Sequence, residues 1–313
     1  MKVFIAGATG VIGSRMVPAL VSKGHHVVGT TRTPAKAPAL MELGATPVVL
    51  DAFDSVAVKG AVAAATPDVV VHELTSIPDV VDPRKLDEQF AETNRLRTEG
   101  MDYLLEAARA AGVRRFVAQS FAAWAYARTG GPVKTEADPV ETDPPASVRQ
   151  TLAALLHVER SLAEATDLEG ISLRYGGFYG PGTSMGRGGS VIDMVRNRRF
   201  PLVGDSRGVW SFIHVDDAAA ATVAAIERGD PGVYNVTDDD PASASVWLPE
   251  LARILKAPPP RHVPVWLARL LAGQTAVVMM TDLRGALNGK AKHELDWQPT
   301  YASWRQGFRE GLG

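Results

Sequence analysis

The sequence predicts an α/β protein, with a Rossmann-type doubly wound parallel sheet and a smaller, mostly helical C-terminal domain. Two observations support this prediction. Short apolar runs alternate with longer helical patterns as far as about Gly180, and a glycine-rich turn follows the first run directly. Continuous apolar strands separated by helices are typical of a parallel sheet that helices cover on both faces.

Several segments have the composition of buried strands. In chain order they are KVFIAGA, HHVVGTTR, TPVVLDA, DVVVHEL, RRFVAQSF and GISLRYGGFYG. Gly24, Gly44 and Gly112 each lie where a helix is expected to end and the next strand to begin. A residue with positive φ is common at such a place.

The α/β order is interrupted after about Gly180. A glycine-rich segment, GPGTSMGRGGS, follows, and the order returns briefly in FIHVDDAAAATVAAIERG and GVYNVTD. We therefore expect residues 1–180 to form a dinucleotide-binding Rossmann domain that residues 213–238 complete. Residues 181–212 and 239–313 are expected to form a substrate-binding lid domain, with APPPR near Pro259 as a linker.

Composition excludes several classes of function. The formal net charge is -2 and the cations are scattered, so no basic surface for nucleic acid is expected. The chain has no cysteine, which excludes disulfides, cysteine metal sites and thiol nucleophiles, and fits a cytoplasmic location. No cluster of His, Asp and Glu has the spacing of metal ligands, so we expect no metal.

No membrane segment is expected. The run MKVFIAGATG enters a glycine turn without the longer apolar region of a signal peptide. The segment VWLARLLAGQTAVVMM is interrupted by Arg269, Gly273 and Gln274 and is too short to span a bilayer. It is interpreted as one or two buried helices.

The first strand leads into a turn that is suited to a nucleotide. Gly7, Gly10 and Gly13 have the spacing GxxGxxG, with Thr9, Val11 and Ile12 between them. Such glycines permit a tight turn, so that free N–H groups at the start of a helix can bind a pyrophosphate. The alternative is an ordinary turn between a strand and a helix, but the position before a parallel-sheet pattern favours the nucleotide.

The end of the second strand favours NADP(H) over NAD(H). No Asp or Glu occurs from Val27 to Met41, whereas Arg32 follows the strand and Lys36 lies one helical turn later. An acidic residue would bind the 2′-hydroxyl of NAD, and an arginine accommodates the 2′-phosphate of NADP. The alternative is that both cations are solvated surface charges.

The chain resembles the extended short-chain dehydrogenases/reductases of the NAD-dependent epimerase/dehydratase type. The stretches that match are GATGVIGS, VVLDAFD, DVVVHEL, ETNRLRTEGMDYLLEAARAAGVRRFVAQS, LRYGGFYGPG, FIHVDDAA, GVYNVTD and AKHELDWQPTYASWRQG. The resemblance implies further cofactor contacts, which are Asp51 and Ala52 at the adenine, Leu74 and Thr75 along the ribose, and Gly177 and Phe178 near the nicotinamide. Alternatively, Asp51 caps a loop, and Asp216 or Asp217 caps a helix.

The resemblance also implies a catalytic triad that this chain lacks. Relatives carry a Ser or Thr after the fifth strand and a Tyr-x-x-x-Lys pair on the next helix. Here Phe121 stands at the first position, one residue after Ser120, while Thr151 and Leu155 stand at the other two. No tyrosine in the chain is followed by lysine at the fourth position.

Hydride transfer can survive this loss. A general acid contributes about 10²- to 10⁴-fold, whereas positioning two reactants contributes about 7 to 11 kcal/mol. We expect Ser120, Thr151 or Tyr126, a water, or a hydroxyl of the substrate to stabilise a developing alkoxide. His157, His72 and Glu73 are interpreted as structural.

Large apolar residues in the variable half predict a roomy pocket for a small-molecule substrate. Phe121, Trp124, Met185 and Trp210 are the candidate substrate contacts. The favoured hypothesis is an NADPH-dependent ketoreductase for a bulky apolar or polycyclic ketone of the secondary-metabolite type. The alternatives are a nucleotide-sugar epimerase/dehydratase, and a non-catalytic NADP-binding sensor or scaffold.

A homodimer is also expected. The resemblance places two helices at the interface that many relatives form, and their apolar residues are Met101, Leu104, Leu105, Leu152, Leu155 and Leu156. A two-fold contact would bury this surface.

Overall fold

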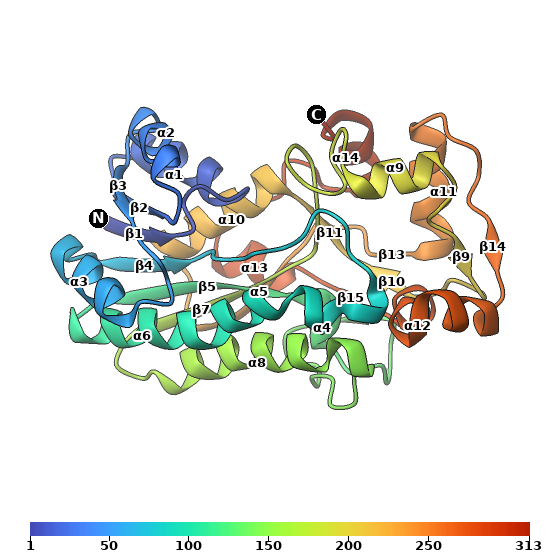
Figure 1. Ribbon diagram of the computed structural model, residues 1–313, viewed down its shortest axis with the longest axis horizontal. Helices are drawn as coiled ribbons and strands as arrows, with labels where there is room; N and C mark the ends of the chain where they lie inside the picture. Colours follow the sequence, from blue (N-terminus) through green and yellow to red (C-terminus); the bar gives the residue numbers. More distant parts are fainter.

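Seven parallel strands form the central sheet of the computed structural model, which describes residues 1–313. Their order is β12-β7-β5-β4-β1-β2-β3, so the chain starts in the middle and winds outward in both directions (Figure 1). The strands are β1 (Lys2–Ala6), β2 (His26–Thr31), β3 (Thr46–Val49), β4 (Val69–His72), β5 (Arg115–Phe121), β7 (Glu169–Tyr175) and β12 (Gly232–Val236). The predicted doubly wound parallel sheet is confirmed.

Helices cover both faces of this sheet. One apolar cluster joins it to α1 (Gly13–Ser22) and α10 (Val215–Glu227), and a second joins it to α3 (Ser55–Ala65), α6 (Met101–Ala110) and α8 (Arg149–Glu164) (Figure 1). The shorter helices of this half are α2 (Ala37–Glu42), α4 (Leu86–Gln89), α5 (Ala91–Arg95), α7 (Ala122–Ala125) and α13 (Gly289–Glu294). The expected positive φ at Gly24, Gly44 and Gly112 is present, at 81°, 89° and 69°.

A third apolar cluster lies beyond the carboxyl ends of the strands. It is rich in aromatic residues, with Phe212, Trp247, Trp304 and Phe308 fully buried. Its helices are α9 (Ser190–Arg196), α11 (Ala244–Ile254), α12 (Val265–Thr281) and α14 (Trp304–Glu310). Short strands complete the molecule: β6 (Val133–Lys134), β8 (Gly177–Tyr179), β9 (Leu202–Val203), β10 (Val209–Trp210), β11 (Phe212–His214), β13 (Ala242–Ser243), β14 (His262–Val263) and β15 (Gly285–Ala286).

The expectation of buried helices at Val265–Met280 was only half right. Gly273, at φ 82°, breaks the helical path inside α12. Beyond this break Val277, Val278 and Met280 are buried, but before it Trp266 and Leu270 are 67% and 73% exposed. The break changes the direction of the chain, so the first part lies on the surface. None of the helices has the length and apolar character needed to cross a membrane.

Four of the six residues proposed for a dimer interface are buried inside the subunit. Met101, Leu104, Leu152 and Leu155 are each at most 3% exposed. They face the sheet or the neighbouring helix, because the apolar face of each helix is needed for the subunit's own core. These four side chains are therefore not available for a dimer contact, whereas Leu156 is half-buried, and the homodimer stays a prediction.

Candidate active site

The glycine turn after β1 packs so tightly that Gly7 and Gly13 have no room for a side chain. A Cβ at Gly7, where φ is 97°, would lie 2.7 Å from the carbonyl oxygen of Glu73, and one at Gly13 would lie 2.4 Å from the oxygen of Gly7. The backbone N–H groups of Val11 and Ile12 have no acceptor in the protein, and the first turn of α1 has no acidic side chain. These features fit a dinucleotide's pyrophosphate at the helix N-terminus.

Arg32 directly follows β2 and is paired with an acid. Its Nη1 is 2.5 Å from Oε1 of Glu92, and the Arg32 side chain is 68% exposed. Ser76 donates its hydroxyl to the other oxygen of Glu92 at 2.8 Å. The Ser76 hydroxyl and the Arg32 guanidinium together lower the pKa of Glu92.

The other residues assigned to the cofactor lie at the carboxyl ends of the strands. Asp51 accepts a hydrogen bond from the N–H of Phe53 at 3.0 Å, which is the loop cap considered as the alternative for this residue. The N–H of Leu74 donates to Nδ1 of His72, whose Nε2 donates to the carbonyl oxygen of Leu96. Burial lowers the pKa of His72 to about 4, so the ring is neutral and holds the loop in place. Ala52 is half-buried and Thr75 is exposed.

Three hydroxyls proposed for the substrate oxygen are engaged within the protein. Ser120 donates to Oε1 of Glu159 at 2.8 Å, and Tyr126 donates to Oδ1 of Asn235 at 2.5 Å. Thr151 donates to Oδ1 of Asp87 at 2.8 Å. Each of the three residues is 3% exposed.

Glu159 and Arg174 form a buried ion pair behind Ser120. Two guanidinium nitrogens of Arg174 donate to the two carboxylate oxygens at 2.7 and 2.6 Å, with side chains 4% and 8% exposed. The Arg174 guanidinium also lies 4.9 Å from the ring centre of Tyr126. The network joins β5, β7 and α8, and Ser120 supplies a proton to it rather than to the open site.

Asp87 fixes the start of α8. Its carboxylate accepts hydrogen bonds from the backbone N–H groups of Gln150 and Thr151, both at 2.8 Å. Asn94 donates its side-chain amide to the hydroxyl of Thr151 at 3.2 Å. Thr151 therefore serves as part of a helix cap made by another helix, which no local sequence pattern indicates.

An apolar pocket opens where β5, the chain after β7 and the lid meet. Eleven residues line it, and eight of these are hydrophobic. The eleven are Phe121, Ala122, Ala123, Trp124, Gly177, Trp210, Ser211, Met279, Leu283, Arg284 and Ala286. Three of the four substrate contacts expected from the sequence are therefore together. Met185 is 5% exposed and packs in the third apolar cluster instead.

A second, smaller pocket continues from the first. The two share Ala123, Trp124, Leu283 and Arg284, and the second adds Tyr126, Arg128 and Glu141. Arg128 donates to Glu141 at 2.7 Å. Arg284 donates to the carbonyl oxygen of Arg128 at 2.5 Å and forms no ion pair.

Glu73 is a buried acid that follows β4 and lies beside the glycine turn. Oε1 of Glu73 lies 2.9 Å from the hydroxyl of Tyr175, which lies 2.6 Å from the hydroxyl of Thr222. Thr222 donates to the carbonyl oxygen of Ala218 at 2.7 Å, so Tyr175 must donate to Thr222 and Glu73 to Tyr175. Burial raises the pKa of Glu73 to about 8, which agrees with a protonated carboxyl.

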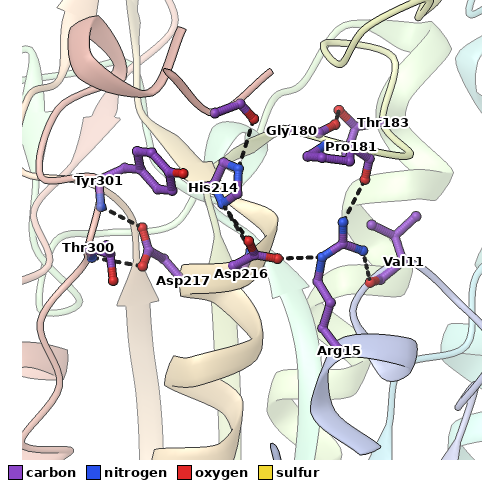
Figure 2. A network of polar contacts seen from close by, with 11 residues as sticks. Val11, Arg15, Gly180, Pro181, Thr183, His214, Asp216, Asp217, Thr300 and Tyr301 are labelled. Carbon is purple, nitrogen blue, oxygen red and sulfur yellow. Dashed lines mark hydrogen bonds and ion pairs between the residues drawn. The ribbon is translucent and has the colours of Figure 1, made fainter. Parts of the chain in front are cut away.

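A polar network holds the glycine turn against the lid (Figure 2). Arg15 donates to the carbonyl oxygens of Val11 and Pro181 at 2.7 and 2.9 Å, and to Asp216 at 2.6 Å. The expectation that Asp216 or Asp217 caps α10 was wrong. His214 is the cap and accepts from the N–H of Asp216 at 3.2 Å.

Asp217 has a different partner, which explains the error. Its carboxylate accepts from the N–H groups of Thr300 and Tyr301 at 2.7 and 2.9 Å (Figure 2). The motif HVDD therefore connects α10 to α1 through Asp216, and to residues 300–301 through Asp217. No group of His, Cys, Asp or Glu in the structure is arranged to hold a metal ion.

Comparison with known proteins identifies the family. Residues 3–237 match the sequence profile of the NAD dependent epimerase/dehydratase family. The chain belongs to this family. A UDP-glucose 4-epimerase from Thermotoga maritima has the same fold, with a TM-score of 0.76 and 21% identity over 100% of this chain and 97% of the epimerase.

Two relatives of this family member are named reductases. A 3-diazoavenalumate denitrifying reductase from Streptomyces sp. is 47% identical over 309 residues, 98% of this chain and 99% of its own. A ketoreductase from Stigmatella aurantiaca, which acts on 4-hydroxy-2-methyl-3-oxo-4-farnesyl-3,4-dihydroquinoline-1-oxide, is 28% identical over 79% of this chain and 71% of its own. The chain is an oxidoreductase that uses a nicotinamide nucleotide and acts on a small molecule.

Proposed function

We propose that this protein is an NADPH-dependent reductase that replaces the diazo group of a bulky aromatic compound with hydrogen and releases N2. The observation that supports it is the engagement of Ser120, Thr151 and Tyr126 with Glu159, Asp87 and Asn235. The expected reaction centre is left without a free hydroxyl donor from these residues. Such a site suits an acceptor whose reduction needs no proton from the protein.

An aryl diazonium ion is an acceptor of this kind. The reduced cofactor would supply a hydride when bound. The new C–H bond would form at the ring carbon, while the C–N bond would break and its electron pair would leave with N2. Charge and atoms balance without a general acid. The missing Tyr-x-x-x-Lys pair is then no loss to the reaction, and the 47% identical relative carries a name for the same type of reduction.

The residues of the pocket have two tasks in this proposal. Phe121, Trp124 and Trp210 present apolar surfaces between which an aromatic ring can stack. They also exclude water, which would otherwise attack a diazonium carbon. Ser120 holds Glu159 in place, and Thr151 holds the start of α8, so both act as positioning residues.

NADPH is proposed as the cofactor because of Arg32 and the absence of an acid at that strand end. Arg32 is 68% exposed at its side chain and is free to turn toward a 2′-phosphate if its contact with Glu92 is released. The glycine turn, Asp51, Ala52, Leu74, Thr75, Gly177 and Phe178 complete the proposed cofactor groove.

Reduction of a bulky apolar ketone is the second candidate. The 28% identical ketoreductase supports it. It requires that a water or a hydroxyl within the substrate protonate the alkoxide, since Ser120, Thr151 and Tyr126 already donate elsewhere. An aromatic ketone of matched size therefore serves as the comparison substrate.

The test uses an aryl diazonium acid and NADPH that carries deuterium at C4, under argon. The protein should release N2 in a one-to-one ratio with NADPH oxidised, and mass spectrometry should find deuterium at the ring carbon that carried nitrogen. A blank without protein measures the spontaneous reaction. Turnover of the ketone only, or N2 release no faster than the blank, would contradict the proposal.

A further inference from the structure

Arg284 is the one charged residue of the main pocket, and its positive charge is not balanced. It forms no ion pair, whereas Arg128 in the adjoining pocket is paired with Glu141 at 2.7 Å. Glu141 also accepts hydrogen bonds from the N–H groups of Thr142 and Asp143 at 2.9 and 2.8 Å. The charge of Glu141 is thus already balanced by these partners. Arg284 is therefore the one cation in the two pockets without a counter-charge.

The guanidinium of Arg284 is also short of hydrogen-bond acceptors. Its only bond is the donation from Nη2 to the carbonyl oxygen of Arg128. Its Nε is buried and has no partner at all. A buried donor without an acceptor destabilises the fold, and more so when it is charged. A bound anion would satisfy this donor and offset the charge.

The position of Arg284 in the pocket points to the substrate. Gly177 and Phe121, which lie at the strand ends where the nicotinamide is expected, line the same pocket as Arg284. The side chains of Trp124 and Trp210 contribute to the wall as well. An elongated aromatic molecule could therefore place its reacting group near the cofactor and an anionic group at the guanidinium.

We propose that Arg284 binds a carboxylate of the substrate, so that this pocket takes aromatic carboxylic acids. A carboxylate has two oxygens for the fork of guanidinium N–H groups, and one negative charge for the one surplus cation. A nucleotide diphosphate would bring more charge than the pocket balances. This assignment deepens the proposed function, since it takes the same pocket as the place of reduction.

The test measures binding without turnover, by calorimetry in the presence of saturating NADP+. The probes are 4-hydroxycinnamate and its neutral methyl ester. The acid should bind the wild-type protein tenfold more tightly or better, the effect of one charge-assisted hydrogen bond. Arg284→Met should remove this preference and leave the ester's affinity within about twofold, while Arg284→Lys should keep part of it.

Arg196→Gln is the matched control, because Arg196 lies on α9 in an exposed pair with Asp193 at 3.8 Å. It should leave both affinities unchanged. Should Arg284→Met fail to fold, as judged by its melting curve, Arg284→Lys and Arg284→Gln decide by the size of the remaining preference.

Several outcomes would overturn the assignment: equal binding of acid and ester by the wild type, an unchanged preference in the Arg284 variants, or no binding of either probe at millimolar concentration. Tight binding of UDP that depends on Arg284 would assign the residue to a diphosphate instead. Acid binding through Arg284 without N2 release from a diazonium compound would refute only the proposed reaction. N2 release without any preference for the acid would refute only the carboxylate site.

Discussion

The Nη1 of Arg32 lies 2.5 Å from Oε1 of Glu92, so the cation proposed to select NADPH is held by an acid when no phosphate is there to compete. Arg32→Ala should weaken NADPH binding on the order of tenfold or more, because one charge-assisted contact is lost, and should change NADH binding little. Calorimetry with both cofactors measures this. Equal losses would contradict the choice of NADPH.

Glu92→Gln should act in the opposite direction. Removing the negative charge releases Arg32 for the 2′-phosphate, so NADPH should bind more tightly, while NADH should be unaffected. Glu99→Gln is a matched control on the neighbouring turn, since Glu99 pairs with Arg95 at 2.8 Å. An effect of the same size in both variants would indicate a general electrostatic change rather than release of Arg32.

The engaged hydroxyls predict modest catalytic effects. Ser120→Ala and Thr151→Val should each lower turnover only by what disturbed positioning costs, and cofactor affinity should change little. Tyr126→Phe should behave in the same way. Steady-state kinetics with the true substrate decides the matter. Complete loss of activity in Thr151→Val, with folding and NADPH binding intact, would show that Thr151 is a dedicated acid.

Glu73 predicts a dependence of stability on pH. Its pKa is about 8 in the folded protein, raised from 4.5 by burial, so the folded state keeps a proton that the unfolded state loses. Stability should fall as pH rises from about 4.5 to about 8, at up to about 1.4 kcal/mol per unit from this group. Glu73→Gln, which keeps a donor to Tyr175, should have a shallower slope in melting temperature against pH. An unchanged slope would mean that Glu73 is ionised in the fold.

Two ion pairs, Glu159 with Arg174 and Glu99 with Arg95, test how burial changes the contribution of a pair to stability. Glu159→Gln leaves Arg174 buried without a counter-charge and should cost roughly 3 to 5 kcal/mol of unfolding free energy. Glu99→Gln removes an exposed pair with Arg95 and should cost at most about 0.5 kcal/mol. Urea unfolding followed by circular dichroism compares the two. Similar costs would show that the Arg174 pair is well solvated.

The sheet and the glycine turn could be predicted from the sequence because their signals are local. Continuous apolar runs, and glycines at fixed spacing before a helix, depend on neighbours in the chain. The roles of Ser120 and Thr151 could not be predicted in this way. Their partners, Glu159 and Asp87, come from other helices and are 39 and 64 positions away.

The pocket shows the same division. Phe121, Trp124 and Trp210 could be expected in the pocket lining because large apolar residues stand out by composition alone. Arg284, which we propose as a carboxylate site, was not expected there, since nothing in its neighbourhood in the sequence separates a cation without a partner from the many surface arginines. Met185 shows the opposite error. It was expected in the pocket because of its residue type, but such a side chain is equally suited to a core.

The lid cluster has a consequence for the order in which the chain becomes functional during synthesis. Trp210 packs on Trp247 with ring centres 5.0 Å apart, and Trp247 shares its cluster with Trp304 and Phe308. The parallel sheet has all its strands once Val236 has been made. The wall of the pocket that contains Trp210 is complete only after the last helix, α14, has been made. The strands that carry the proposed nucleotide groove are therefore made first, while the surface that receives the second reactant is complete only when translation has passed Phe308.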